Sequence, residues 1–200
     1  MKAHPHDNRV RIIGGEWRSR LVSFPVSEGL RPTPDRVRET LFNWLGQALY
    51  SKTCLDLFAG SGALGFEALS RGADRVVMVE NSRLAIEALK RNAEALKAAR
   101  LEIVAGDAVQ FLAGSRERFD IIFLDPPYGA ELLPRLFSLL PDRLKPDGTV
   151  YFENDRAAEP PSGWIITRQS RAGTVRFQLA RLAGREGEET DDQSRLSRNV

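Results

Sequence analysis

Residues 54–69 read CLDLFAGSGALGFEAL, and this stretch decides the fold. A short apolar run ends at Asp56, three glycines follow with the spacing G-x-G-x-x-G, and a helical pattern begins among them. The glycines are Gly60, Gly62 and Gly65. Glycine at these positions lets the backbone turn tightly and lets a ligand approach it closely. The stretch therefore predicts a strand, a cofactor-binding loop and a helix, in that order.

Apolar runs and amphipathic patterns alternate along the rest of the chain. Short runs rich in β-branched or aromatic residues predict strands at residues 54–59, 75–80, 101–107, 119–125 and 148–154. Apolar residues spaced by three and four predict helices between them, at residues 63–72, 82–99, 108–115 and 130–144. Strands and helices in alternation are typical of a parallel sheet with helices on both faces.

The last two apolar runs follow a different rule. Residues 164–170 and 174–182 are separated only by Arg-Ala-Gly, which is too short for a crossover, so they predict an antiparallel hairpin. We therefore expect a Rossmann-like α/β fold with a mostly parallel seven-stranded sheet and an antiparallel C-terminal hairpin.

The chain ahead of this core predicts a β-hairpin and a helix. Residues 9–25 contain two strand patterns around Gly14–Gly15, a pair typical of a hairpin turn. Residues 31–49 have a helical pattern, with Thr33 expected as the N-cap and Pro34 at the first helical position. The apolar face of this helix, which we expect in the core, carries Val37, Leu41, Trp44, Leu45 and Leu49.

We expect three parts along the chain. Residues 1–50 are a basic hairpin and helix packed on the core, and residues 51–183 are the core itself. Residues 184–200 are polar and lack periodicity, so we expect them to be disordered.

The composition is that of an ordinary globular protein. The 200 residues are 42% hydrophobic and 28% charged, which is enough for one domain with its own core. No apolar run approaches the roughly 20 residues of a membrane span, and a signal-peptide pattern is absent, so we expect a cytoplasmic protein. Cys54 lies in an apolar run and is expected to be a buried thiol. His4 and His6 lie in a polar leader, so we expect no metal site.

Cations are unevenly placed, although the formal net charge is only +2. This asymmetry favours a polyanionic partner, and a merely solvated charged surface is the alternative. The arginines concerned are Arg9, Arg11, Arg18, Arg20, Arg31, Arg36 and Arg38 early in the chain, and Arg168, Arg171, Arg176 and Arg181 late in it.

Two acidic residues indicate which cofactor the glycine loop binds. Glu80 ends the second predicted strand, where a carboxylate suits the ribose hydroxyls of any adenosine cofactor. Asp56 ends the first strand, where a carboxylate would repel the pyrophosphate of NAD but attract the ammonium and sulfonium of S-adenosylmethionine. We therefore expect S-adenosylmethionine. Asp107 ends the third strand, and we expect it beside the adenine ring, as the N-cap of the next helix, or in both roles.

A second motif, FDIIFLDPPYG at residues 119–129, follows the fourth predicted strand. Proline cannot continue a strand ladder, so Asp125 and Pro126 form a stiff extended ledge beyond the strand end. The Asp125 carboxylate and the Pro126 carbonyl can accept both hydrogens of a nucleobase amine and aim its lone pair at a methyl sulfonium. Tyr128 can stack on a base that has left its own stack. The ledge therefore predicts an amine methyltransferase.

These motifs resemble those of class I, Rossmann-like, S-adenosylmethionine-dependent amino-methyltransferases. The glycine loop, the tripeptide at 79–81 and the DPPY motif at 125–128, with residues 11–25 and 29–45, are similar to the bacterial 16S rRNA guanine-N2 methyltransferase family. The resemblance covers the chain from about Arg9 to Ala183. For that family the product is N2-methylguanine at guanine 966 of 16S rRNA, made on assembled or assembling small subunits. The resemblance implies this activity and this partner, and we expect a monomer.

Carried over position by position, the resemblance implies the site residues. The expected catalytic residues are Asp125, Pro126, Pro127 and Tyr128. The expected cofactor-binding residues, of which the first three close over the cofactor, are Arg31, Pro32, Thr33, Asp56, Phe58, Gly60, Ser61, Gly62, Glu80, Asn81, Asp107 and Ala108.

The hairpin is the expected RNA contact, because Arg11, Arg18 and Arg20 can neutralise phosphates without reading bases. Trp17 in the hairpin either stacks on RNA or fixes the hairpin to the core.

Four other functions are alternatives. An oxidoreductase would have to bind NAD more tightly than S-adenosylmethionine. A DNA adenine or cytosine amino-methyltransferase usually needs a target-recognition insertion, and none here is large enough. A protein-glutamine methyltransferase has asparagine at the position of Asp125. A non-catalytic RNA-binding assembly factor would not need the intact acidic residues.

Overall fold

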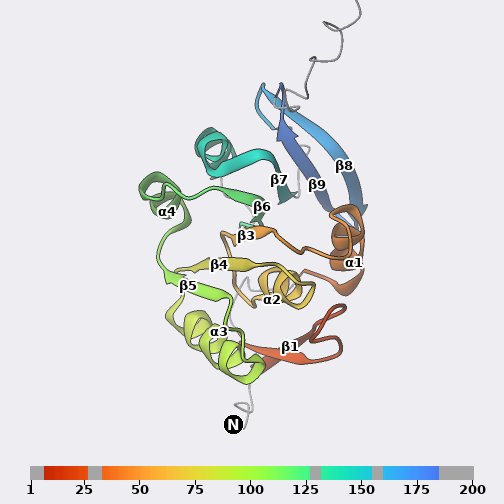
Figure 1. Cartoon of the computed structure of the whole chain (residues 1–200), viewed down its shortest axis with the longest axis vertical. Helices are drawn as coiled ribbons and strands as arrows, with labels where there is room; N and C mark the ends of the chain where they lie inside the picture. Colours follow the sequence, from red (N-terminus) through yellow and green to blue (C-terminus); the bar gives the residue numbers. More distant parts are fainter. Residues whose placement is uncertain (1–6, 27–32, 127–131, 155–159, 185–200) are drawn as a thin grey trace, which may run out of the picture.

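The computed structural model describes residues 7–26, 33–126, 132–154 and 160–184. Its elements follow the order predicted from the sequence (Figure 1). The strands are β1 (Asp7–Arg11), β2 (Leu21–Pro25), β3 (Thr53–Asp56), β4 (Arg75–Glu80), β5 (Leu101–Ala105), β6 (Phe119–Leu124), β7 (Leu144–Asn154), β8 (Trp164–Ala172) and β9 (Val175–Leu182). The helices are α1 (Asp35–Trp44), α2 (Ala63–Ser70), α3 (Arg83–Leu96), α4 (Ala108–Gly114), α5 (Leu132–Leu139) and the 3-10 helix η1 (Leu140–Arg143).

Within the described residues, seven strands form one sheet in the order β5-β4-β3-β6-β7-β9-β8, and β1 pairs with β2 separately. The pairs from β5 to β7 are parallel, whereas β9 is antiparallel to both β7 and β8. This confirms the predicted mostly parallel sheet with an antiparallel C-terminal hairpin. The strand that precedes the proline ledge, β6, lies beside β3, where the winding of the sheet reverses. In such sheets ligands bind outside the carboxyl ends of the strands near this reversal.

Helices cover both faces of the large sheet (Figure 1). Strand side chains alternate between the two faces, so each face carries apolar side chains that the helices bury. On one face, Phe42 of α1 and Phe66 of α2 belong to the same buried cluster as Phe123 of β6. On the other face, Leu112 of α4 and Phe137 of α5 belong to a second cluster. Burial on both sides explains why the central strands are continuous apolar runs in the sequence.

The N-terminal hairpin is present, but its connection is longer than a tight turn at the glycine pair. Residues 12–20 join β1 to β2. Gly15 has a φ of +77°, and a Cβ there would lie 1.8 Å from the carbonyl oxygen of Ser70, so the close approach to α2 requires glycine. Trp17 in this connection is buried in the core. Its role is therefore to fix the hairpin to the core, and the alternative of stacking on RNA is wrong.

One buried carboxylate on α2 joins the N-terminal segment to the core. Glu67 is fully buried and accepts hydrogen bonds from the backbone N–H groups of Ile13 and Gly14, each at 2.8 Å. The guanidinium of Arg38 on α1 donates to Glu67 at 3.3 Å, and that of Arg71 donates at 2.8 Å. The hairpin connection, α1 and the end of α2 therefore meet at a single side chain.

Helix α1 begins later than predicted. Its first residue is Asp35, and its N-cap is Pro34, whose ψ of 149° is extended and whose side chain makes no capping bond. The prediction of Thr33 as N-cap and Pro34 as first helical residue is wrong. The Thr33 hydroxyl instead donates a hydrogen bond to Asp125, at 3.4 Å. The Thr33 hydroxyl therefore serves a contact with a distant part of the chain, and it does not cap its own helix.

Other expectations from the sequence are met in part. Trp44, expected in the core, is half-buried against it and stacks on Phe177 with ring centroids 5.2 Å apart, whereas Cys54 is buried as predicted. Leu49 is buried but lies beyond the end of α1, which stops at Trp44. No helix in the described part of the chain is long and apolar enough to cross a membrane. The two histidines and residues 185–200, expected to be disordered, lie outside the described residues.

Replacing Glu67 with alanine is expected to destabilise the protein by about 3 to 5 kcal/mol, the usual cost of removing one partner of a buried ion pair. The reason is that Arg38 keeps a buried charge and two backbone N–H groups lose their acceptor. Urea denaturation measures this free energy of unfolding.

The matched control is Glu87→Ala on α3, because Glu87 is exposed and pairs only with exposed Arg83 in the salt bridge that the structure shows. This control should change stability by no more than about 0.5 kcal/mol. Equal effects at Glu67 and Glu87 would show that the buried junction contributes little.

Candidate functional site

Four acidic residues meet at the carboxyl edge of the large sheet. Asp56 ends β3, Glu80 ends β4, Asp125 directly follows β6, and Glu153 is the penultimate residue of β7. The strands β4, β3, β6 and β7 are consecutive in the sheet. Because parallel strands place their carboxyl ends at the same edge, the four side chains belong to one site.

Glu80 holds the glycine loop through backbone hydrogen bonds. Its Oε2 accepts from the N–H of Gly60 at 2.7 Å, and its Oε1 accepts from those of Asn81 and Ser82 at 3.0 and 2.8 Å. Gly62, with a φ of +79°, is the N-cap of α2. The carboxylate is therefore fixed beside the loop, and its remaining lone pairs can accept hydrogen bonds from ribose hydroxyls.

Asp56 is buried beneath the same loop. Its Oδ2 accepts a hydrogen bond from the N–H of Gly65 at 3.1 Å. A Cβ on Gly65 would lie 2.3 Å from Cε of Met78 and 3.3 Å from this oxygen, so a larger residue here would have to displace the Met78 side chain. Burial raises the pKa of Asp56 to about 7, the Gly65 N–H opposes this, and the charge of Glu80 adds to it. A ligand cation next to Asp56 would favour its ionised form.

Asp125 stands next to Asp56 and Glu153 at the end of β6. The Thr33 hydroxyl donates to its Oδ2 at 3.4 Å, and the following residue, Pro126, is buried. Burial raises the pKa of Asp125 well above its usual value, and the charges of Glu153 and Asp56 raise it further. The ledge therefore presents a carboxyl group whose protonation responds to any charge that enters the site.

Glu153 belongs to the site but was not among the residues predicted. It is buried, and the fully buried Tyr151 donates its hydroxyl to Oε1 of Glu153. The sequence held a signal for it, because Glu153 ends an apolar run in the same way as Asp56, Glu80 and Asp125 do. That signal carries less weight alone, since no glycine loop or proline pair accompanies it.

The other predicted cofactor residues take varied positions. Asp107 is the N-cap of α4, with its Oδ1 accepting from the N–H of Gln110 at 2.9 Å, which confirms the capping alternative. Ala108 is buried at the start of α4, Ser61 is buried in the glycine loop, and Phe58 packs against the second core cluster. Asn81 is exposed beside Glu80. Arg31, Pro32, Pro127 and Tyr128 lie outside the described residues.

The site residues fit S-adenosylmethionine. Glu80 and Asp56 offer acceptors for the ribose and for the cationic groups of this cofactor. Among the described residues, no lysine or arginine pairs with Asp56. A positively charged ligand would therefore supply the counter-charge that no described protein group gives to Asp56.

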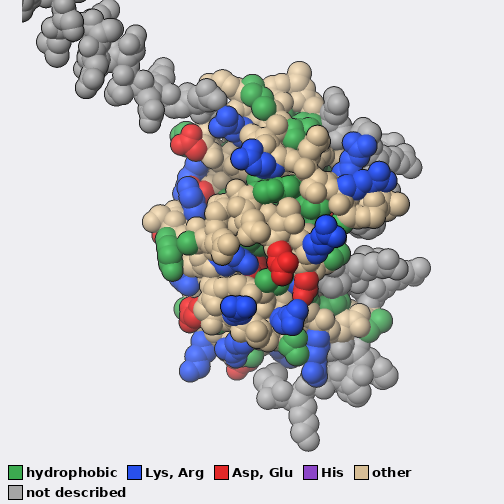
Figure 2. Space-filling model, turned by 90° about the vertical axis from the view of Figure 1, so that its right-hand side faces the viewer, with side chains coloured by type: hydrophobic (Ala, Val, Ile, Leu, Met, Phe, Trp, Pro, Cys, Tyr) green, Lys and Arg blue, Asp and Glu red, His purple; other side chains and the backbone are tan. Residues whose placement is uncertain are grey.

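The predicted RNA-binding arginines differ in whether another group of the protein already binds their guanidinium. Arg18 is exposed, and its guanidinium has no hydrogen bond to another described residue. Arg11 pairs with Asp35 at 3.1 Å, and Arg20 donates to the carbonyl oxygen of Ala95 at 2.9 Å. Figure 2 shows Lys and Arg side chains scattered over the face that it draws, with Asp and Glu side chains between them. Arg38 is not part of this surface, because it is fully buried.

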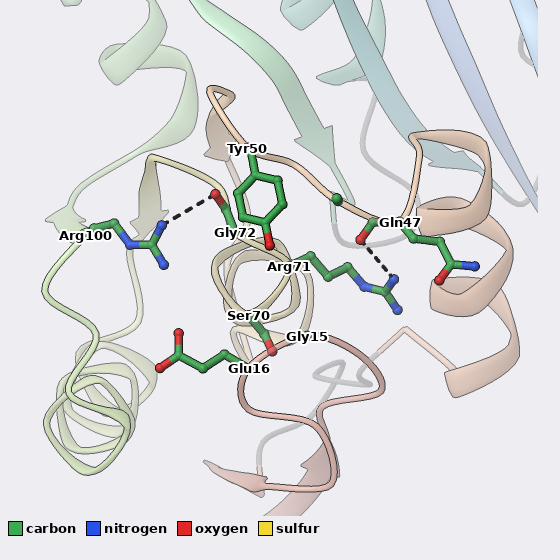
Figure 3. A pocket seen from close by; sticks show the side chains of 9 residues that line it. Gly15, Glu16, Gln47, Tyr50, Ser70, Arg71, Gly72 and Arg100 are labelled. Atoms are coloured by element: carbon green, nitrogen blue, oxygen red, sulfur yellow. Dashed lines mark hydrogen bonds between the residues drawn. The ribbon is translucent and has the colours of Figure 1, made fainter.

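A surface pocket of about 350 Å³ lies at the opposite edge of the sheet (Figure 3). Gly72 and Arg100, which line it, precede the amino ends of β4 and β5. Arg100 donates to the carbonyl oxygen of Ala73 at 2.8 Å, and Arg71 donates to Glu67. Both guanidinium groups thus stabilise the fold, and the pocket is separate from the acidic site. Among the described residues there is also no cluster of three or more potential metal ligands.

The chain is similar to known methyltransferases over most of its length. A family model described as "Conserved hypothetical protein 95" matches residues 10–181. Ribosomal RNA small subunit methyltransferase D of Escherichia coli (strain K12) is 42% identical over 181 residues, covering 88% of this chain and 91% of that protein. The Haemophilus influenzae protein of the same name is 42% identical over 178 residues, covering 85% of this chain and 92% of that one. The solved structure of Escherichia coli yhhF has a TM-score of 0.79 at 42% identity, covering 88% and 98% of the two chains.

Replacing Asp56 with asparagine is expected to change how stability depends on pH. A carboxyl whose pKa is raised to about 7 in the folded state adds stability that is complete below its unfolded pKa and is lost as the pH rises through 7. Asparagine binds no proton and still accepts from Gly65. The free energy of unfolding of Asp56→Asn should therefore fall less between about pH 4 and pH 8, by on the order of 2 kcal/mol.

Urea denaturation across this pH range makes the measurement on the free protein. Asp147→Asn, at an exposed aspartate early in β7, is the matched control and should follow the wild-type curve. Parallel curves for wild type and Asp56→Asn would mean that Asp56 ionises in the folded protein as it does in the unfolded chain.

Proposed function

Because the chain belongs to the family of ribosomal RNA small subunit methyltransferase D, we propose that it methylates the exocyclic N2 amine of a guanine in 16S rRNA. The guanine is number 966, as the resemblance of its motifs implies, and the substrate is the small ribosomal subunit or an assembly intermediate. The observation that carries this proposal is the position of Asp125. It directly follows β6, beside Asp56 at the end of β3, so an acceptor for an amine lies next to a site for a cationic methyl donor.

The ledge would orient the amine. An exocyclic amine is a poor nucleophile, because its lone pair is delocalised into the ring of the base. The Asp125 carboxylate and the Pro126 carbonyl accept its two hydrogens, which favours a pyramidal nitrogen and directs the lone pair to the methyl group. Well-oriented reactants can gain about 7 to 11 kcal/mol in this way. Positioning therefore supplies much of the acceleration.

The glycine loop and its two acidic residues would hold the methyl donor. S-adenosylmethionine supplies an activated methyl group and leaves as a neutral thioether. Glu80 accepts from the ribose hydroxyls, Asp56 offsets the positive charge, and the positive φ angles of Gly60 and Gly62 give the loop its shape. No protein nucleophile has to form a covalent bond for this transfer.

The hairpin connection would contact the RNA backbone. Arg18 is its most available cation, since Arg11 and Arg20 already bind protein groups. Contacts to phosphate position an RNA without reading its sequence, so the choice of guanine must come from other parts of the site. Tyr128 is the proposed stacking partner of the flipped base, although it lies outside the described residues.

Methyl transfer from labelled S-adenosylmethionine to small subunits from a strain that lacks this protein tests the proposal. Mass spectrometry should find N2-methylguanine at a single position, which is guanine 966 if the resemblance holds in full. Label on DNA or on glutamine in protein, and none on subunits or free 16S rRNA, would replace the proposed substrate by one of the alternatives.

Asp125→Ala is expected to reduce methyl transfer to the limit of detection, because the amine loses the acceptor that orients it. The affinity for S-adenosylmethionine, measured by calorimetry, should stay within a few-fold of wild type. A large loss of that affinity would instead place Asp125 in the cofactor site.

Arg18→Ala is expected to weaken RNA binding at every sequence and to lower the salt slope of log K by about 1, since one phosphate contact is lost. Arg116→Ala is the matched control, because Arg116 is an exposed arginine in the connection between α4 and β6, outside the hairpin. Filter binding at several salt concentrations makes the comparison. Equal slopes for the two variants would move the RNA contact away from the hairpin.

A further inference from the structure

Glu153 is a buried carboxyl that neither the glycine loop nor the proline ledge explains. Strands β6 and β7 are parallel, and Phe123 is paired with Tyr151. Two residues further along each strand are Asp125 and Glu153. Because side chains alternate along a strand, both carboxyls lie on the same face as Phe123 and Tyr151, which is the face that α1 and α2 cover.

A hydroxyl lies between the two carboxyls. Thr33 Oγ1 donates to Asp125 Oδ2 at 3.4 Å, and the same hydroxyl is close enough to Glu153 to lower the pKa of that carboxyl. Tyr151 donates its hydroxyl to the far side of Glu153. A hydroxyl has one proton to donate, so Thr33 can bond both carboxyls only while one of them is protonated, by donating to the ionised one and accepting from the other. Tyr151, Glu153, Thr33 and Asp125 therefore form one row of neighbouring polar groups.

Charge couples the two carboxyls as well. The pKa of Asp125 is raised by burial and then by the charge of Glu153, with a smaller effect of Asp56. The pKa of Glu153 is raised by burial, while its bonds from Tyr151 and Thr33 oppose that shift. Neighbouring carboxylates repel each other in a low dielectric, so the charge of either one favours protonation of the other.

We propose that Glu153 is a positioning residue of the methyl transfer, which orients the Asp125 carboxylate through Thr33 and makes it the acceptor of the proton that the methylated amine releases. The inference rests on the proposed function. The lone pair of the amine nitrogen forms the bond to the methyl carbon while the carbon–sulfur bond breaks and leaves its electron pair on sulfur. Nitrogen then carries the positive charge. One N–H bond breaks, its electron pair returns to nitrogen, and the proton moves to Asp125.

The charges in the site explain why one group can act twice. Asp125 is ionised while a cation lies beside it, and it then accepts hydrogen bonds from the amine. Once the positive charge has moved to nitrogen, the negative charge of Glu153 favours protonation of Asp125. The same carboxylate therefore orients the amine before transfer and takes its proton afterwards.

Few charged groups surround this pair among the described residues. The α1 side contributes the Thr33 hydroxyl, and Arg38 is engaged with the Thr33 carbonyl oxygen at 3.1 Å and with Glu67. No described lysine or arginine pairs with Asp125 or Glu153. The groups that face the pair are Tyr151 on β7, Asp56 on β3, and the apolar Phe177 on β9.

Titration of the Asp125 carboxyl in the free protein tests the coupling directly. Glu153→Gln keeps the size of the side chain and an acceptor for Tyr151, but it removes the charge. With ¹³C-labelled aspartate carboxyls, the Asp125 signal, assigned by its loss in Asp125→Asn, should titrate at lower pH in Glu153→Gln. Glu87→Gln, at an exposed glutamate of α3, is the matched control and should leave the midpoint unchanged. An unchanged midpoint in Glu153→Gln overturns the inference, whatever the protein methylates.

Single-turnover kinetics test the role in the reaction. Glu153→Gln should lower the rate at least about ten-fold, with its acid limb at lower pH and the Kd of S-adenosylmethionine within about three-fold of wild type. Thr33→Val, which removes the connecting hydroxyl but no charge, should also slow transfer. Glu153→Asp should restore part of the rate.

The outcomes separate the two proposals. A wild-type protein that transfers no methyl group to the guanine amine refutes the proposed function. A wild type that does so, with Glu153→Gln and Thr33→Val matching it in rate and in pH profile, refutes only the role of Glu153.

Discussion

The buried carboxylate of Glu67 is the interaction on which the rest of the structure depends. It lies on α2, the helix that the glycine loop begins, and it binds the backbone of the hairpin connection and the guanidinium of Arg38. Arg38 in turn donates to the carbonyl oxygen of Thr33, whose hydroxyl reaches Asp125. A buried charge without partners costs several kcal/mol, so these segments are stable only together. The hairpin connection, helix α2 after the glycine loop, and Asp125 are thus linked by one set of hydrogen bonds.

The acidic residues at the carboxyl edge of the sheet differ from Glu67, because no described lysine or arginine pairs with them. Asp56 and Glu153 are buried beside the half-buried Asp125, and the pKa values of all three carboxyls are raised, mainly by removal from water. Such a cluster destabilises the free protein and is arranged for a ligand that brings positive charge. The apolar faces of the sheet therefore provide most of the stability of the fold. The carboxyl edge is less stable as long as no positively charged ligand is bound there.

Much of this arrangement could be predicted from local patterns. The alternation of apolar runs and helical spacing is sufficient to predict the order of the elements and the parallel sheet. The glycines after Asp56 and the prolines after Asp125 identify the two motifs. The failures concern contacts between distant segments. Thr33 has the sequence of an N-cap but bonds to Asp125, and Trp17 is placed only by its packing against the core. Glu153 becomes recognisable only when β7 is known to lie beside β6.

The junction at Glu67 also has a consequence for folding during synthesis. The hairpin strands leave the ribosome before α2, and their connection cannot complete its hydrogen bonds until the chain has been made as far as α2. The central strand β3 likewise needs β6, which is made much later. Until then, the apolar side chains of the hairpin and Trp17 have no core to pack against. During this interval the nascent protein is open to aggregation and to binding by chaperones.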